Sequence, residues 1–185
     1  LIVGADPKYG HGRGVVSTAS YEARKFGVHS GMPISRAYQL CPQGIYLPVN
    51  FHLYWQVSSN IMTIARKYAD KFQQSSVDEA FLDASSCGSF DEAERIAKKL
   101  KMDIVEKEKL TCSIGIGPNK LIAKIASDYK KPDGVTVVKE NQVKDFLFPM
   151  PVRKLHGVGK KTEQILKEWG IDTIGDLAKF DKSLL

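Results

Sequence analysis

The 185-residue sequence predicts an α+β fold organised around a ferredoxin-like sheet. Segments 51–68 and 91–109 repeat apolar side chains at helical spacing, which predicts two amphipathic helices. Between them, the alternating β-rich segment 72–84 predicts a hairpin, and segment 111–116 predicts a strand after the second helix. Helix, hairpin, helix and strand give the order αββαβ, and one strand ahead of it would complete the βαββαβ plan of that sheet.

Before the first long helix, the sequence predicts short strands and short helices. The strands are expected at 1–5, 15–18 and 45–49, and the helices at 21–26 and 33–40. Ser20 is a suitable cap for the first of these helices, and Pro33 suits the first position of the second. Because Leu1 begins inside a strand with no earlier element to pair with it, we expect the sequence to be a fragment.

After residue 116, smaller elements and a boundary are expected. They are a helix at 118–129, a turn at 131–134, an edge strand at 135–138, and helical segments at 152–155, 160–169 and 173–180. Pro149 and Pro151 mark the boundary ahead of the last three segments. The core faces of the two long helices should hold Leu53, Val57, Ile61, Ile64, Ala65, Tyr68, Ile96, Ala97, Leu100, Ile104 and Val105.

Composition excludes several classes of protein. With 43% apolar and 26% charged residues, the chain is neither disordered nor fibrous. No run approaches the roughly 18 apolar residues of a membrane helix, so we expect a soluble, cytoplasmic protein with no membrane partner. Cys41, Cys87 and Cys112 are odd in number and lack a CxxC pair, which favours reduced thiols over disulfides or zinc. The net charge of +6 favours anionic partners only mildly.

A pair of neighbouring carboxylates, Asp78 and Glu79, lies at the tip of the predicted hairpin or within it. Neighbours on a regular strand face opposite sides, so both can reach one site only where the backbone bends. Carboxylates suit Mg²⁺, and two such ions about 4 Å apart would activate an attacking hydroxyl and stabilise a departing pyrophosphate. An ordinary exposed turn is the alternative.

A Gly-x-Gly segment between helices is the second candidate site. Gly157 and Gly159 would expose backbone N–H groups at a helix N-terminus, where Lys160 and Lys161 add positive charge. Such a hairpin can hold a nucleic-acid backbone without reading bases. It is not a Walker A loop, because Lys154 stands where a glycine is required. A tight corner between helices is the alternative.

Tyr21 and Arg24 are three residues apart and share one face of a short helix, where a hydroxyl and a guanidinium could bind phosphate. Lys131, in the predicted turn at 131–134, could also bind phosphate. The alternative is that all three side chains lie on a solvated surface and bind nothing. The glycine-rich turn near residue 12 does not match a dinucleotide-binding loop, and the histidines show no ligand spacing.

Taken together, these segments resemble a Y-family DNA polymerase of the DinB or polymerase IV group. The resembling stretches span nearly the whole chain in the family's order: 17–27 with 31–33, 76–83, 113–124, 131–134 and 157–159. The resemblance implies a palm built on the ferredoxin-like sheet, a small fingers insertion and a helical thumb segment with a helix-hairpin-helix. The expected boundaries are 1–19 and 49–148 for the palm, 20–48 for the fingers and 149–185 for part of the thumb.

The resemblance also implies an activity, translesion DNA synthesis on primer-template DNA from dNTPs. Asp78 and Glu79 would be catalytic ligands of two Mg²⁺ ions. Thr18, Tyr21, Arg24 and Lys131 would hold the triphosphate, and Gly157, Gly159, Lys160 and Lys161 would meet the DNA backbone. A sliding clamp would bind through a segment outside this chain.

Two features of the family lie outside the sequence. The family's first strand, with a third metal-binding Asp, would precede Leu1, and its C-terminal DNA-holding domain would follow Leu185. We therefore expect the chain by itself to be inactive. A non-catalytic DNA-binding module that uses the hairpin at 157–159 is the main alternative, and a nucleotide cyclase, which leaves that hairpin unexplained, ranks last.

Overall fold

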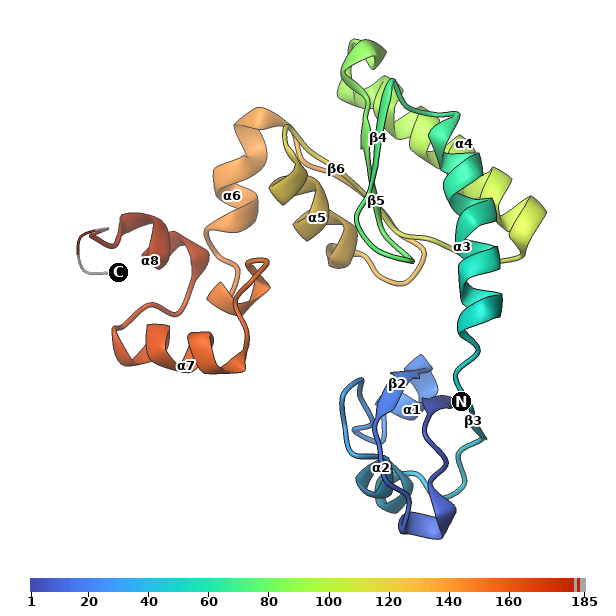
Figure 1. Cartoon of the computed structure of the whole chain (residues 1–185). Coiled ribbons are helices and arrows are strands. Elements are labelled where there is room, and N and C mark those ends of the chain that lie inside the picture. Colours follow the sequence, from blue (N-terminus) through green and yellow to red (C-terminus); the bar gives the residue numbers. More distant parts are fainter. Residues whose placement is uncertain (182, 184–185) are drawn as a thin grey trace. The chain divides into compact units, whose positions relative to one another are not determined.

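A computed structural model describes residues 1–181 and 183 of the chain. It divides into two compact units, Leu1–Gln56 and Val57–Leu185, each described here by itself. The division falls inside helix α3 (Phe51–Arg66). Figure 1 follows the chain from strand β1 (Ile2–Gly4) to helix α8 (Ile174–Lys179).

The first unit is a small three-stranded sheet with short helices. Its elements are β1, the 3-10 turn η1 (Lys8–Gly10), β2 (Val16–Ala19), α1 (Tyr21–Arg24), α2 (Ile34–Leu40) and β3 (Tyr46–Leu47). β1 is the central strand: Ile2 pairs with Ala19 in antiparallel β2 and with Tyr46 in parallel β3. Ile2 and Ile34 are fully buried in the cluster that joins this sheet to the helices.

The second unit begins with helices and strands in the predicted order. After α3 come β4 (Lys71–Gln74), β5 (Ala80–Asp83), η2 (Ser85–Cys87), α4 (Phe90–Glu108), β6 (Ile114–Ile116), α5 (Lys120–Tyr129), β7 (Val135–Val137), η3 (Glu140–Gln142) and α6 (Val143–Leu147). β4 and β5 pair antiparallel, with Phe72 opposite Leu82, and β6 and β7 pair parallel, with Ile114 opposite Val135. Within the described residues these are two separate pairs of strands.

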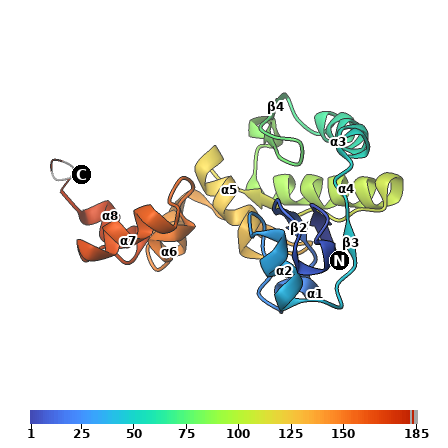
Figure 2. The ribbon, with the colours of Figure 1, turned by 60° about the horizontal axis from the view of Figure 1, so that its bottom comes forward.

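Apolar packing joins these elements. Ile64 and Ala65 of α3 pack against Leu100 and Ile104 of α4, and Figure 2 shows the two helices next to each other. Ile122, Ile125 and Ala126 of α5 are buried with side chains of α6 and α8. The core therefore lies between helices and strands that are far apart in the sequence.

The C-terminal part consists of short helices. These are η4 (Val152–Lys154), α7 (Lys160–Glu168) and α8. Val152 and Ile171 are fully buried between them. Thr173 caps α8 by accepting a hydrogen bond from the backbone N–H of Asp176, at 3.1 Å. The predicted helical segments are confirmed, although the first is a 3-10 turn.

Some sequence expectations were wrong in detail. Leu53 and Val105, expected in the core, are 47% and 42% exposed, because a helix of 3.6 residues per turn carries their positions off the buried stripe. Ser58 and Ala93 are buried instead. Pro33 precedes α2 as its cap and does not occupy its first turn. Helix α6 was missed, since five residues carry almost no periodicity.

The three cysteines are unpaired thiols, with Cys41 buried and the other two half-buried. Burial raises the pKa of the Cys112 thiol. Across the described part of the chain, no helix is long and apolar enough to cross a membrane.

Candidate functional site

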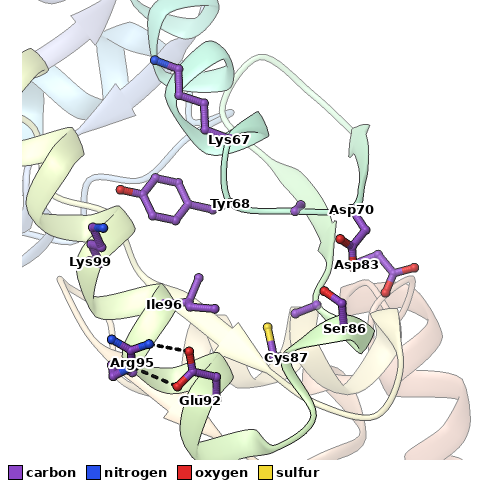
Figure 3. Close-up of a pocket in the computed structure, with 12 residues that line it drawn as sticks. Lys67, Tyr68, Asp70, Asp83, Ser86, Cys87, Glu92, Arg95, Ile96 and Lys99 are labelled. Atoms are coloured by element: carbon purple, nitrogen blue, oxygen red, sulfur yellow. Dashed lines mark hydrogen bonds and ion pairs between the residues drawn. The ribbon is translucent and has the colours of Figure 1, made fainter.

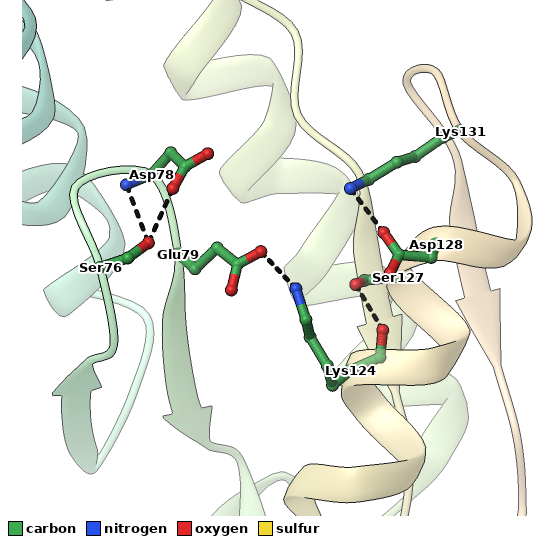
Figure 4. Close-up of polar contacts among 7 residues, drawn as sticks. All are labelled: Ser76, Asp78, Glu79, Lys124, Ser127, Asp128 and Lys131. Carbon is green, nitrogen blue, oxygen red and sulfur yellow. Dashed lines mark hydrogen bonds and ion pairs between the residues drawn. The ribbon is translucent and has the colours of Figure 1, made fainter. Parts of the chain in front are cut away.

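The neighbouring carboxylates lie where the β4–β5 hairpin closes (Figure 4). The ladder ends at Gln74 opposite Ala80, and the loop between them is closed by the N–H of Ser75, which donates to the carbonyl of Glu79 at 2.9 Å. Asp78 is in this loop, and its Oδ1 accepts a hydrogen bond of 2.7 Å from the Ser76 hydroxyl. The backbone therefore bends in the loop that holds Asp78 and Glu79, and does not continue there as a regular strand.

Helix α5 presents lysines to the hairpin. The Lys124 ammonium forms an ion pair with Glu79, whose side chain is 41% exposed, while that of Lys124 is only 19% exposed. One helical turn earlier, Lys120 donates to the Gln73 side chain and lies 5.7 Å from the centroid of the Phe81 ring. Both contacts come from one face of α5, because residues four apart are neighbours on a helix.

These two lysines were not among the residues predicted for the site. Their i, i+4 spacing marks a common helix face, which is a weak signal. The partner of Lys124 is 45 residues away, so no local pattern indicates the pair.

The carboxylates match a hard divalent cation in kind, since Mg²⁺ prefers oxygen ligands. Asp78 is exposed, and Glu79 already faces a positive charge, that of Lys124. Within residues 1–181 and 183, no cluster of three or more His, Cys, Asp or Glu side chains could hold an ion. Asp78 and Glu79 are two oxygen-bearing side chains, fewer than such a cluster contains.

Lys131 lies at the end of α5, seven residues after Lys124 (Figure 4). Its ammonium is 2.5 Å from Asp128 Oδ1, and both side chains are about half exposed, at 46% and 47%. Such a pair contributes little to stability, because solvent screens it. Lys131 and Asp128 therefore form a solvent-screened pair at the surface.

Thr18 lies in β2, and Tyr21 and Arg24 lie in α1, the helix that follows it in the first unit. Ser20 caps α1 by accepting from the N–H of Ala23 at 3.3 Å, as predicted, and this helix follows β2 directly. Tyr21 is 53% exposed, and the Nε of Arg24 donates to the Ala19 carbonyl at 3.0 Å. This bond fixes the guanidinium next to the end of the strand that carries Thr18.

The glycine hairpin at 155–159 precedes α7. Gly157 has φ +96°, a conformation that favours glycine, and the Val158 N–H donates to the Leu155 carbonyl at 3.1 Å. Gly159 caps α7, and a Cβ there would meet nothing within 4 Å. Lys160 and Lys161 are exposed in the first helical turn, whose backbone N–H groups have no partner within the helix. Backbone N–H donors and two lysine side chains thus lie together at the N-terminus of α7.

Comparison with known proteins matches almost all of these segments to one family. Residues 1–128 match the model of the impB/mucB/samB family, and residues 140–171 match the IMS family HHH motif. The chain belongs to the impB/mucB/samB family. The first match contains the carboxylate hairpin and Lys124, and the second contains the hairpin at 155–159.

Relatives and solved structures agree with this assignment. DNA polymerase IV 2 of Methanosarcina mazei is 55% identical over 100% of this chain and 50% of its own length. DNA polymerase IV of Streptococcus agalactiae is 46% identical over 96% of this chain and 49% of its own length. The crystal structure of DinB from Sulfolobus solfataricus is 38% identical, with a TM-score of 0.89, over 98% of this chain and 53% of that one.

An insertion ternary complex of Dbh DNA polymerase has the same identity, TM-score and coverage. The resemblance to the DinB group of Y-family polymerases and the predicted α+β fold class are confirmed by these matches. The chain spans about half the length of the curated relatives it matches.

The described part of the second unit includes a large groove and a smaller cleft. A groove of about 1300 Å³ runs from α5 to the glycine hairpin. Its lining has an excess of basic over acidic side chains: Lys124, Lys130, Arg153 and Lys154 against Asp128 and Asp145. A cleft of about 440 Å³ lies at the opposite end of β5 from Glu79 (Figure 3). Its lining balances three basic side chains with three acidic ones: Lys67, Arg95, Lys99, Asp70, Asp83 and Glu92. The larger groove is the better candidate for a polyanion.

Proposed function

We propose that the protein carries out template-directed DNA synthesis past lesions, transferring a nucleotide from a dNTP to the 3′ hydroxyl of a primer. The observation that carries this proposal is the Asp78–Glu79 pair at the hairpin end, facing Lys124, in a chain of this family. Because the chain spans about half of its relatives, we propose the activity for the protein of full family length.

In this proposal Asp78 and Glu79 would hold Mg²⁺, with two ions taking part in the reaction. Bound divalent ions would supply charge neutralisation and a lowered pKa of the attacking hydroxyl. The contribution of the chain itself is to hold two carboxylates in one bend of the backbone. Lys124 balances the charge of Glu79 until a cation binds.

The incoming triphosphate would be held by four side chains that offer hydrogen-bond donors or positive charge. Tyr21 and Thr18 offer hydroxyl donors, Arg24 a guanidinium and Lys131 an ammonium. Phosphoryl transfer depends mainly on positioning and charge neutralisation, and these side chains supply both. We propose no covalent role for any of them.

Primer-template DNA would lie along the basic groove, with its backbone against the glycine hairpin. Gly157, Gly159, Lys160 and Lys161 would contact phosphates without reading bases.

For the domains, the proposal assigns the palm to 1–19 and 49–148, the fingers to 20–48 and part of a thumb to 149–185. A sliding clamp would bind through a segment outside residues 1–185.

The test is primer extension by the full-length protein with Asp78→Asn and Glu79→Gln. We expect each variant to lose at least 100-fold in the rate of dNTP incorporation, since a carboxylate ligand is removed, while affinity for primer-template DNA changes less than threefold. Asp83→Asn is the matched control, because Asp83 lies at the other end of β5 and binds Ser85. Extension at the normal rate by Asp78→Asn would overturn the proposed site.

A polypeptide of residues 1–185 is a second arm of this experiment. We expect it to bind DNA but not to extend a primer, because it contributes two carboxylates and the proposed reaction uses a third. Robust synthesis by this polypeptide would show that our assignment of the site is wrong. If the full-length protein binds DNA but never extends a primer, the non-catalytic DNA-binding module is the correct function.

A further inference from the structure

Lys101 differs from its neighbours on α4. Its side chain is 14% exposed, whereas those of Lys98 and Lys107 are 62% and 48% exposed and pair with acids on the same helix. An ammonium that is largely buried is unfavourable unless its protons have acceptors. Lys101 points inward from α4 toward the segment around β6 and β7, and there it finds those acceptors.

The ammonium of Lys101 has three acceptors in two segments. It donates to the carbonyl of Cys112, to the carbonyl of Asp133 at 2.9 Å, and to the carboxylate of Asp133. An ammonium has three donors, so these contacts use all of them. Lys101 therefore links α4 to the residues before β6 and to the turn between α5 and β7.

This turn is closely packed. A Cβ on Gly134 would lie 2.1 Å from the Lys130 carbonyl oxygen, so the two ends of the turn touch. Gly134 also donates to the Ser113 hydroxyl at 3.3 Å and accepts from the Ile114 N–H at 2.9 Å. Asp133 has φ +59°, in the left-handed region, where two bonds from Lys101 hold it. A shift of Asp133 would therefore move Lys131 as well.

We propose that Lys101 is the positioning residue for Lys131: through Asp133 it sets where the Lys131 ammonium lies when the triphosphate binds. This inference rests on the proposed function, in which Lys131 contacts the nucleotide. Lys101 itself does not touch the nucleotide, because its donors are bonded inside the protein.

The experiment is a double-mutant cycle in the full-length protein, measured as single-dNTP incorporation on a primer-template. We expect Lys131→Met to raise the KM for dNTP about tenfold, the effect of one lost charged contact of about 1.4 kcal/mol. Lys101→Met should raise KM about threefold to tenfold, with kcat changed less than twofold. In the Lys131→Met background, Lys101→Met should then have no further effect on KM, because both act through one group.

Lys98→Met is the matched control on the same helix, where an exposed pair with Glu94 is removed. A purely structural role for Lys101 predicts a fall in kcat with the folded fraction, or a KM effect that persists without Lys131, and either result overturns the proposal. If Lys131→Met leaves KM unchanged, the proposed nucleotide role of Lys131 fails first, and the positioning role falls with it.

Lys101→Gln is the second variant, because its amide can donate to the carbonyls without an ion pair. We expect a smaller KM increase than for Lys101→Met, and again none without Lys131. If neither Lys101 variant folds, as judged by thermal unfolding, Lys101 serves stability alone and the proposal is overturned.

Discussion

Tyr68 and Asp103 share a hydrogen bond that shifts the pKa of both side chains. The Tyr68 hydroxyl donates to Asp103 Oδ2 at 2.6 Å and so links the residues after α3 to α4. This hydrogen bond is the main reason why the pKa of Tyr68 rises from 10.0 to about 12. It is also the main reason why the pKa of Asp103 is lowered. The bond therefore makes stability depend on pH at both ends of the range.

The pKa shifts of Tyr68 and Asp103 have opposite signs, so each affects stability in a different pH range. For Tyr68 the folded pKa is raised, so its contribution is complete below about pH 10 and is lost as pH rises toward 12. For Asp103 the folded pKa is lowered, so its contribution is complete above the ordinary pKa of an aspartate and is lost as pH falls through the folded value. The contribution is present throughout the neutral range.

Tyr68→Phe should remove this contribution. We expect the free energy of unfolding at pH 7 to fall by about 1–2 kcal/mol, since a hydrogen bond to a charged group is lost. The loss of stability between pH 10 and 12 should also become smaller than in the wild type. Urea unfolding across that range measures both effects.

Tyr129→Phe is the control, because Tyr129 is 61% exposed and its ring contact with Phe146 would remain. An unchanged alkaline slope in Tyr68→Phe would show that this hydroxyl does not stabilise the fold.

At the scale of elements, β6 and α5 pack unusually closely. A Cβ on Gly115 would lie 2.0 Å from the Ala123 carbonyl oxygen and 2.3 Å from the Ser127 nitrogen. The helix that carries Lys120, Lys124 and the approach to Lys131 thus lies directly on the strand. Its N-terminus is capped by Asn119, which accepts from the Ile122 N–H at 3.0 Å.

Gly115→Ala should destabilise the protein by about 3 kcal/mol, because backbone atoms of α5 cannot move aside as a flexible side chain could. Gly159→Ala is the matched control, since a Cβ there meets nothing within 4 Å, and the variant should lose less than about 1 kcal/mol, the cost of alanine at an N-cap position. Urea unfolding compares the two variants. Equal stabilities would mean that α5 and β6 are less closely packed than described.

The same elements show how far sequence patterns reach. The hairpin that carries Asp78 and Glu79 was predicted because alternation and turn residues are local signals. The Ser20 cap was predicted for the same reason. Lys101 was missed, because its partner Asp133 is 32 residues away and only packing brings the two together.

At the scale of the whole molecule, positive charge gathers along the groove that ends at the glycine hairpin. The net charge of +6 indicates little by itself, since acids and bases are mixed over much of the chain. What matters for DNA binding is where the lysines lie. A lysine that neutralises a phosphate releases a counterion, and this release makes DNA binding depend on salt concentration.

Lys160→Gln combined with Lys161→Gln should weaken binding of the full-length protein to DNA of any sequence. We expect the slope of log K against log salt to become shallower by about one for each lysine that contacts a phosphate. Fluorescence anisotropy at several salt concentrations measures the slope. Lys98→Gln on α4 is the control, and an unchanged slope in the double variant would exclude these lysines from the DNA interface.

Most of the helices and strands, the hairpin that carries Asp78 and Glu79, and the family could be predicted from local patterns, because periodicity, turns and motifs are properties of neighbouring residues. Local patterns did not reveal which charges meet, and the folded chain pairs Lys124 with Glu79 and Lys101 with Asp133. The physical reason is that an ion pair requires its two groups to be close in space, and packing of the core sets that distance.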